Sequence, residues 1–226
     1  MESAPLVNLN KKKIYLITNH KSGDILLNIL KNLPFISEVR IGSPNIIEEM
    51  TESFLSNYDC IIYDLYDGGF GKPTEKIEQI KAYLENDGGS FLITHDHWDY
   101  NKGPLNLIGL VEDKNFKYQV SNKAKINIYP HEHNIYNSYE DLSNFGMIDI
   151  ELTHQTFHRV IEGGNAKIIM ELHLNNTSSI KHDYLVVNEI GRGRIAYWAA
   201  GHSNKINENE KKLFINIIAW LTRYKK

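Results

Sequence analysis

The sequence predicts an α/β fold with three layers, in which a mostly parallel sheet carries helices on both faces. In the amino-terminal half, short runs of strand-forming residues alternate with segments whose apolar residues recur at helical spacing. The run at 59–64 has an unbroken apolar centre, which is typical of a strand buried on both faces. Right-handed crossovers place the carboxyl ends of such strands along one edge, where open α/β folds bind ligands.

The chain enters this pattern with a strand expected at 14–18 and a helix after it. Ser22 is a good residue to begin that helix because its hydroxyl can cap free backbone N–H groups. Pro34 stops the helix because proline lacks the backbone N–H group. The expected buried face of the helix consists of Ile25, Leu26, Ile29, Leu30 and Leu33.

Two more helices are expected between the strands at 37–41 and 90–94. Ser43 followed by Pro44 predicts the start of the second helix, because proline is preferred at the first helical position. The third helix is expected at 74–86, and a glycine pair ends it in a left-handed cap. The apolar residues of the second helix are Ile46, Met50 and Phe54.

The carboxyl-terminal half begins with a less regular segment, at about 98–161, which contains prolines and many polar residues. It predicts short strands and loops, and it is a candidate for an insertion over the ligand edge. Strands are expected again at 166–173, 183–190 and 194–200, with a hairpin turn at 191–193.

The last helix is expected to begin near Asn207, with Glu210 as the partner in a capping box. With this helix the whole chain, 1–226, is interpreted as one domain. Its expected buried face consists of Leu213, Phe214, Ile217, Trp220 and Leu221.

The composition limits the classes of function. The net charge is −3 with histidine neutral, which gives no sign of a surface for nucleic acid or anionic lipid. No apolar run is long enough to span a bilayer, and no apolar signal core opens the chain. A single cysteine excludes an internal disulfide and favours a reducing, cytoplasmic location. We therefore expect a small-molecule partner, no nucleic acid and no membrane.

Three segments in this order resemble the ThuA-like family. The segment 87–95 has a glycine-rich turn, an apolar strand and a histidine, and 133–135 is similar to a degraded His-Pro-Ile element. The most specific segment runs from Gly191 through Trp198 to Gly201 and His202, followed by the amphipathic last helix. The resemblance covers nearly the whole chain.

The resemblance implies a flavodoxin-like sheet of the class I glutamine amidotransferase-like type, with a site at the strand carboxyl edge. The family is associated with trehalose and related sugar utilisation. The wider superfamily places a nucleophilic cysteine where this sequence has His95, and a glutamate after a late histidine where His202 is followed by Ser203-Asn204. Cys60 falls inside an expected buried strand. Cysteine-dependent glutamine hydrolysis is therefore not expected.

The densest polar cluster at any expected strand end is His95, Asp96, His97 and Asp99. Histidine moves protons near neutral pH, and a neighbouring carboxylate can fix its tautomer. His95 is therefore the candidate acid/base, with Asp96 as a catalytic candidate and His97 as a substrate-binding one. The alternative is a polar loop that caps the next segment.

Asp64 ends the third strand, and Asp67 lies in the glycine-rich turn that follows it. If the sheet is wound as expected, Asp64 lies next to the cluster and could orient His95 or bind sugar hydroxyls. Asp67 is a weaker substrate-binding candidate, because a glycine-rich turn with capping groups explains it as well.

The last expected strand ends at the ligand edge near His202, which is the remaining catalytic candidate. Gly201 would let the backbone approach a ligand closely. Trp198 could stack on a sugar ring, although a tryptophan in the core is the alternative.

A divalent metal is an open possibility for the cofactor. The cluster at 95–99 has suitable ligand types, and His131-Glu132-His133 and the pair His154/His158 have close spacings. The second pair does not lie in a clear helix and lacks the adjacent glutamate of the zinc proteases. The metal ligands therefore stay unknown.

Three functions follow from these candidates. The first is a ThuA-like protein that binds, and as an enzyme would transform, a small carbohydrate-like substrate, with His95 as the acid/base in hydrolase-like or sugar-modifying chemistry. The second is a non-catalytic ligand-binding or assembly domain of the same superfamily. The third is a metal-dependent hydrolase. Whether the chain is an enzyme, and its oligomeric state, do not follow from the sequence.

Overall fold

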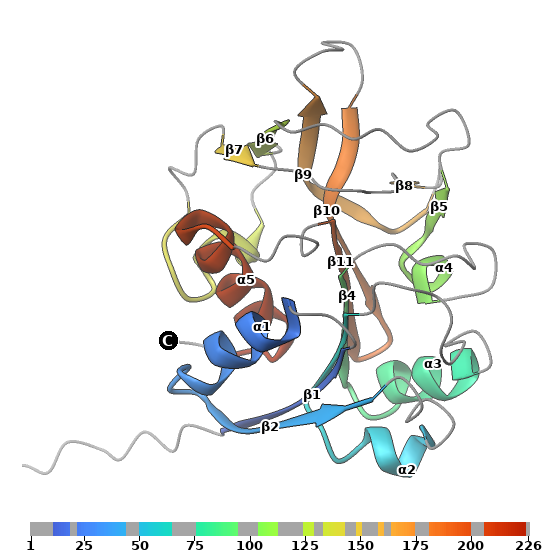
Figure 1. Cartoon of the computed structure of the whole chain (residues 1–226). Coiled ribbons are helices and arrows are strands. Elements are labelled where there is room, and N and C mark those ends of the chain that lie inside the picture. The colour runs from blue at the N-terminus through green and yellow to red at the C-terminus, as the bar shows by residue number, and fades with distance from the viewer. Residues whose placement is uncertain are drawn as a thin grey trace, which may run out of the picture.

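A computed structural model shows a single large sheet with helices on its two faces (Figure 1). The structure describes residues 11–18, 22–43, 50–64, 76–94, 104–112, 124–128, 133–142, 148–150, 158–160, 164–174, 181–199 and 206–224. None of the helices in these segments is long and apolar enough to cross a membrane.

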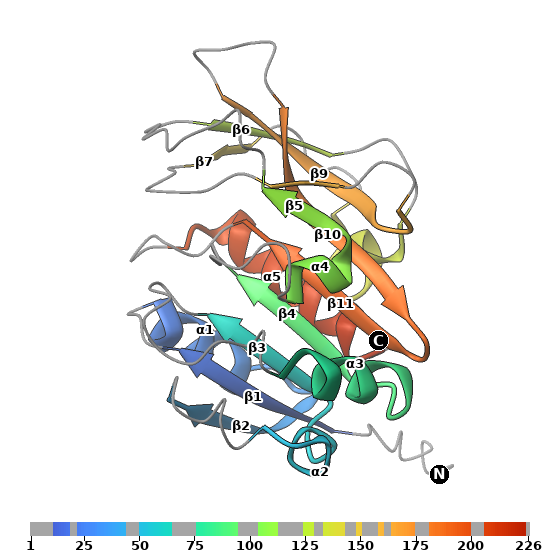
Figure 2. The ribbon, with the colours of Figure 1, turned by 90° about the vertical axis from the view of Figure 1, so that its right-hand side faces the viewer.

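Five parallel strands form one half of the sheet, in the order β2-β1-β3-β4-β11. The arrowheads of β1, β3 and β4 point the same way in Figure 2. The two central strands, β3 and β4, are buried along their whole length, as the unbroken apolar runs predicted. The five strands are β1 (Lys12–Thr18), β2 (Ile36–Gly42), β3 (Cys60–Asp64), β4 (Ser90–Thr94) and β11 (Gly193–Trp198).

Antiparallel strands extend the sheet beyond β11, in the order β10-β9-β6-β7. The hairpin between β10 and β11 turns at Gly191, whose φ of 56° is left-handed, as the glycine-rich turn predicted. β6 and β7 come from the irregular middle of the chain, and β5 pairs with β8 in a separate two-stranded sheet. Their bounds are β5 (Leu110–Glu112), β6 (Ala124–Ile128), β7 (Ile148–Ile150), β8 (His158–Val160), β9 (Lys167–Leu174) and β10 (Lys181–Ile190).

The helices form two layers. α1 (Ser22–Lys31) and α5 (Glu208–Leu221) cover one face, and α2 (Glu52–Leu55), α3 (Ile77–Glu85) and α4 (Pro104–Ile108) lie on the other side in Figure 1. The three-layer α/β fold class is therefore confirmed. Beyond the predicted hairpin of β10 and β11, the added finding is that β9, β6 and β7 continue the sheet with antiparallel pairing.

The second helix does not run unbroken through Met50 to Phe54 as predicted. Residues 44–49 lie outside the described part, and Met50 and Thr51 precede α2 in non-helical backbone. Thr51 has extended backbone angles, and its hydroxyl accepts a hydrogen bond from Phe54 N at 3.1 Å. A helix cap therefore stands where the apolar spacing predicted helix interior, because a threonine side chain satisfies a free N–H group of the first turn.

The last helix begins as predicted. Asn207 accepts from Glu210 N at 2.9 Å, and the Glu210 carboxylate accepts from Asn207 N at 3.0 Å. This capping box fixes the start of α5, whose apolar face is completely buried against the sheet.

Candidate functional site

Four residues form a row across the carboxyl ends of the central parallel strands. Thr18 of β1 pairs with Asp64 of β3, Asp64 with Thr94 of β4, and Thr94 with Trp198 of β11. Because residues paired in register point to the same side of a sheet, the four side chains share one face. We call them the strand-end row.

The strand-end row faces the layer of α1 and α5. The Trp198 ring stacks on Phe214 of α5, with ring centroids 5.6 Å apart. At the other end, a Cβ atom on Gly23 in α1 would lie 2.4 Å from Thr18 Oγ1. Glycine is therefore required there, because any side chain would overlap the threonine. The first turn of α1 lies directly against the row.

Asp64 is the centre of this site. It is fully buried, and its two carboxylate oxygens accept hydrogen bonds from the hydroxyls on either side. Thr94 Oγ1 donates at 2.6 Å and Thr18 Oγ1 donates at 3.0 Å. Hydrogen bonds to a charged acceptor are the strong kind, and a buried carboxylate needs them. The two threonines thus fix the orientation of a carboxylate at the edge where parallel sheets bind ligands.

A second polar group lies beside the row. Tyr184 of β10 and Trp198 are fully buried, and neither the phenol oxygen nor the indole N–H has a hydrogen bond that meets normal geometry. Burial first, and then the charge of Glu210, raise the pKa of Tyr184 well above its ordinary value, and a contact with the indole N–H of Trp198 acts in the opposite direction. The two groups are thus neighbours whose alignment falls short of a normal hydrogen bond.

Glu210 connects this pair to the start of α5. It is almost buried, and burial raises the pKa of its carboxyl group, while its hydrogen bond from Asn207 acts in the opposite direction. Two carboxyl groups, Asp64 and Glu210, are therefore held on the same side of the sheet, both by local hydrogen bonds.

Cys60 lies at the other end of β3 from Asp64. It is completely buried, and burial raises the pKa of its thiol far above the ordinary value. A thiol in this environment is a small apolar group rather than a nucleophile.

Of the predicted site residues, the structure describes Asp64 and Trp198. Asp64 stands at the strand end, where the prediction put it. The Trp198 ring is fully buried against Phe214, which is the core alternative rather than an exposed platform for a sugar. The other candidates lie outside the described residues, and their roles stay predictions: His95, Asp96, His97, Asp67, Gly201 and His202.

The metal candidates are only partly described. No group of three potential ligands close enough to hold a metal occurs within the segments that the structure describes. His131, His154 and the cluster at 95–99 lie outside those segments. His158 is in a strand, β8, rather than a helix, so helical spacing does not bring it to His154.

His133 belongs to the opposite edge of the sheet. Its ring lies 5.3 Å from the Trp220 ring, near the end of α5, and Arg194 at the start of β11 covers the same tryptophan. Burial first, and then the charges of Lys167 and Arg194, lower the pKa of His133 to about 4. The imidazole Nδ1 accepts from Ile135 N at 3.3 Å, so this histidine caps a short 3-10 helix at Asn134–Asn137.

Sequence reasoning missed Thr18 and Thr94 as site residues. The signal for both was available, since each threonine is the last residue of an apolar strand that leads to the ligand edge. Their contact with Asp64 depends on the strand register, which the sequence leaves open.

Comparison with known proteins places the fold. Neither a protein-family model nor a curated protein matches the sequence. A protein of Bacteroides uniformis named as ThuA-like superposes with a TM-score of 0.69 at 13% identity, over 100% of this chain and 97% of that one. A cytoplasmic protein, STM1381, of Salmonella typhimurium LT2 gives 0.67 at 15% identity, over 95% of this chain and all of that one.

A larger enzyme contains the same fold. The cold-adapted β-galactosidase of Rahnella sp. R3 matches 95% of this chain with a TM-score of 0.61 and 13% identity, over 32% of its own length. At these identities the likeness concerns the fold. The expected flavodoxin-like arrangement is confirmed, and this chain shares the fold of a ThuA-like protein over its whole length.

Proposed function

We propose that the chain binds a small, polyhydroxylated, carbohydrate-like ligand at the carboxyl edge of its sheet, and that Asp64 is the central group of this site. The observation that carries the proposal is the buried Asp64 carboxylate held between the Thr18 and Thr94 hydroxyls. An oriented carboxylate can accept a hydrogen bond from a sugar hydroxyl or from the histidine that transfers a proton.

His95 is the proposed acid/base because it directly follows Thr94, which donates to Asp64 at 2.6 Å. Asp64 would then keep the imidazole in one tautomer, which is the usual role of a carboxylate behind a catalytic histidine. His202, Gly201, Asp96, His97 and Asp67 are the proposed supporting residues on the neighbouring loops.

Two of the structural neighbours support this ligand class. One neighbour is named as ThuA-like, and another is a β-galactosidase in which the matched region is about a third of the chain. The name of a further neighbour favours a cytoplasmic location for this chain as well. Cysteine chemistry is not part of the proposal, because Cys60 is buried in β3.

The non-catalytic assembly alternative predicts a large exposed apolar patch. Among the described residues, Ile41 is the only large hydrophobic side chain that is exposed, at 51%. This observation favours a small-molecule ligand over a protein partner at the described surface.

The test is calorimetric binding to a panel that contains trehalose, glucose, galactose and myo-inositol. Asp64→Asn keeps the shape of the side chain and removes its charge, so we expect at least about tenfold weaker binding of the sugar that binds wild type. Asp59→Asn is the matched control, since Asp59 precedes the same strand at the opposite edge and pairs with Lys12. Equal affinities for Asp64→Asn and wild type, or no binding of any sugar to wild type, would refute the proposal.

A measurement of sugar turnover distinguishes the enzyme hypothesis from the non-catalytic binding hypothesis. If His95 is the acid/base, His95→Ala should abolish conversion of the bound sugar while it leaves the affinity within a few fold. Binding without conversion in both wild type and His95→Ala would support the non-catalytic alternative.

A further inference from the structure

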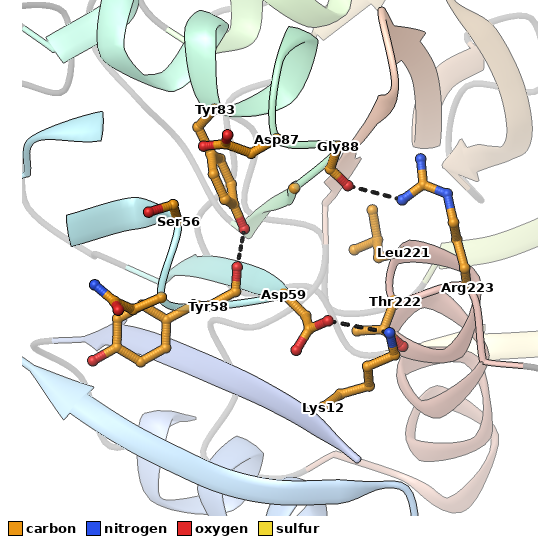
Figure 3. Close-up of a pocket in the computed structure, with 12 residues that line it drawn as sticks. Lys12, Ser56, Tyr58, Asp59, Tyr83, Asp87, Gly88, Leu221, Thr222 and Arg223 are labelled. Atoms are coloured by element: carbon orange, nitrogen blue, oxygen red, sulfur yellow. Dashed lines mark hydrogen bonds and ion pairs between the residues drawn. The ribbon is translucent and has the colours of Figure 1, made fainter. Parts of the chain in front are cut away.

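A cavity of about 240 Å³ opens at the amino edge of the sheet, at the opposite end of the strands from Asp64 (Figure 3). Its walls come from the start of β1, the loop before β3, the turn before β4 and the end of α5. The exposed atoms of the lining are mostly polar. The charged side chains that line it are Lys12, Asp59, Asp87 and Arg223.

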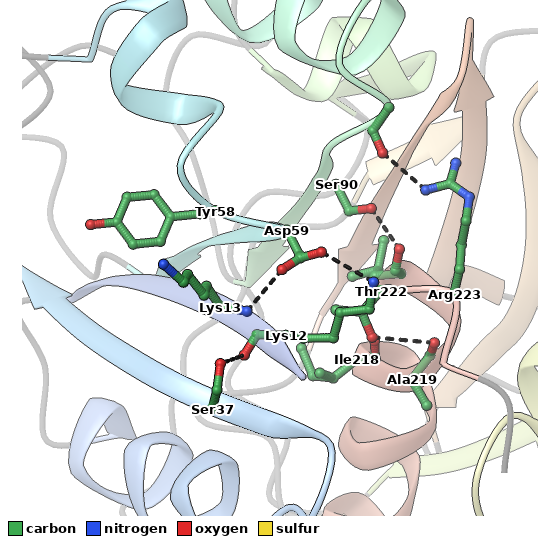
Figure 4. Close-up of polar contacts among 12 residues, drawn as sticks. Lys12, Lys13, Ser37, Tyr58, Asp59, Ser90, Ile218, Ala219, Thr222 and Arg223 are labelled. Atoms are coloured by element: carbon green, nitrogen blue, oxygen red, sulfur yellow. Dashed lines mark hydrogen bonds and ion pairs between the residues drawn. The ribbon is translucent and has the colours of Figure 1, made fainter. Parts of the chain in front are cut away.

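One cation and one carboxylate of the cavity neutralise each other. Lys12 Nζ donates to Asp59 Oδ1 at 3.1 Å, and Asp59 Oδ2 accepts from Lys13 N at 2.9 Å (Figure 4). Both oxygens of Asp59 therefore have a partner within the protein. Tyr83 closes the inner wall, where its hydroxyl donates to Tyr58 O at 2.9 Å.

The other two charges have no such partner. Arg223 forms no ion pair with an acidic side chain in the described part of the chain, and the Asp87 carboxylate has neither an ion pair nor a hydrogen bond there. Both are exposed at the rim of the cavity. Burial and then the charge of Arg194 lower the pKa of Arg223, while the charge of Glu189, which is paired with Arg194, acts in the opposite direction.

Arg223 occupies a backbone position that favours glycine. Its φ is 54°, in the left-handed region, directly after the cap residue Thr222 of α5. Tyr224 N donates to Ala219 O at 2.9 Å and Arg223 N to Trp220 O at 3.1 Å, which is the Schellman pattern that usually ends with glycine. A bulky residue there costs about 1 kcal/mol, and such strain is concentrated at functional positions.

The same position directs the Arg223 side chain to the cavity. The guanidinium donates to the backbone oxygen of Gly88 at 2.9 Å and to that of Arg192. Two neutral carbonyl groups thus hold a full positive charge at the rim, and three of its five N–H groups remain for another acceptor. Figure 3 shows Arg223 and Lys12 along the α5 side of the cavity, and Asp87 beside Tyr83.

We propose that this cavity binds a small zwitterion of the amino-acid type, with its carboxylate on Arg223 and its ammonium group on Asp87. The charges of the lining sum to zero, but one cation and one anion on the rim are not paired. A ligand that carries both charges complements them, whereas a simple anion would meet Asp87 and the negative end of α5.

The experiment is calorimetric titration of the whole chain with glycine, β-alanine and γ-aminobutyrate, in which the charges are increasingly separated. Acetate and methylammonium are the single-charge controls. We expect one zwitterion to bind at least about tenfold more tightly than either control. We also expect Arg223→Gly and Asp87→Asn each to weaken it by about tenfold or more, and Arg192→Gln, which removes a neighbouring exposed charge, to leave it unchanged.

The melting temperature of the unliganded protein gives a second measurement. Arg223→Gly relieves the left-handed strain, so we expect its Tm to be no lower than that of wild type and up to about 3 °C higher. A fall of about 3 °C or more would mean that the arginine is kept for its contacts to the two carbonyls, and would overturn the proposal. So would the absence of binding by all three zwitterions. Asp64→Asn should bind the zwitterion like wild type, because this cavity is independent of the carboxyl-edge site.

Discussion

Asn216 offers the most direct test of how the described parts of the fold are held together. It is fully buried in the middle of α5 and forms four hydrogen bonds to the segment 135–140. Its Oδ1 accepts from Glu140 N at 2.7 Å, and its Nδ2 donates to the backbone oxygens of Ile135, Tyr136 and Glu140 at 2.9, 3.1 and 2.8 Å. The side-chain amide of Asn216 therefore satisfies backbone groups of this irregular segment that a neighbouring strand would otherwise satisfy.

Asn216→Leu keeps the approximate volume and removes all four hydrogen bonds. The four contacts share three hydrogen atoms, two from the Asn216 amide and one from Glu140 N. At about 1 kcal/mol for each hydrogen, less about 1 kcal/mol gained from burying the apolar side chain, we expect a loss of roughly 2 kcal/mol of unfolding free energy. For a chain of this length that corresponds to a fall in Tm of roughly 4–8 °C.

Urea denaturation and thermal melting measure this loss, and Asn32→Leu is the matched control. Asn32 is exposed and donates to Asn28 O at 2.7 Å, so the same chemical change there should alter stability by less than about 0.5 kcal/mol. A loss below about 1 kcal/mol in Asn216→Leu would refute the conclusion that the amide holds 135–140 to the helix.

Three further predictions concern the pKa of one group, one unsatisfied pair and one close approach. His133 has a pKa lowered from 6.5 to about 4, so its contribution to stability is complete above about pH 6.5 and is lost as the pH falls towards 4; His133→Gln should flatten that part of a stability curve measured against pH. Tyr184→Phe removes a buried hydroxyl that is at most loosely aligned with Trp198, so Tm should fall by less than about 2 °C, and a larger fall would reveal a hydrogen bond that the geometry does not show. Gly89→Ala should cost roughly 3 kcal/mol in denaturant titrations, because its Cβ would lie 2.0 Å from the buried Tyr83 ring, and a near-neutral result would contradict that packing.

Sequence patterns predicted the parallel half of the sheet well because its signals are local. The apolar runs of β3 and β4, the glycine-rich hairpin turn and the capping box at Asn207 each depend on a few neighbouring residues. The antiparallel half was harder to predict, because β6 and β7 are short. The pairing of β6 with β9 and of β7 with β6 joins residues that are far apart in the chain.

The carboxyl-edge site and the amino-edge cavity also differ in how far the sequence predicts them. Asp64 could be predicted as a site residue, because a carboxylate at the end of a buried strand falls at the ligand edge. Thr18 and Thr94 became part of the site only through the register of three strands. The amino-edge cavity could not be predicted from the sequence, since the residues around Arg223 do not indicate its left-handed backbone conformation.

Asp59 and Asp64 stand at opposite ends of β3, and their partners explain why the two edges can be tested separately. Asp59 is half-exposed and paired with Lys12, so removal of its charge changes a surface ion pair that contributes little to stability. Asp64 is fully buried, and hydrogen bonds from two hydroxyl groups hold its carboxyl group in place. Burial of an acidic side chain is unfavourable, and a neutral asparagine would fit the same space. We therefore expect Asp64 to be needed for ligand binding rather than for folding. We expect Asp64→Asn to be at least as stable as wild type and to bind the sugar less tightly. That result would show that the carboxylate contributes to ligand binding and not to the stability of the fold.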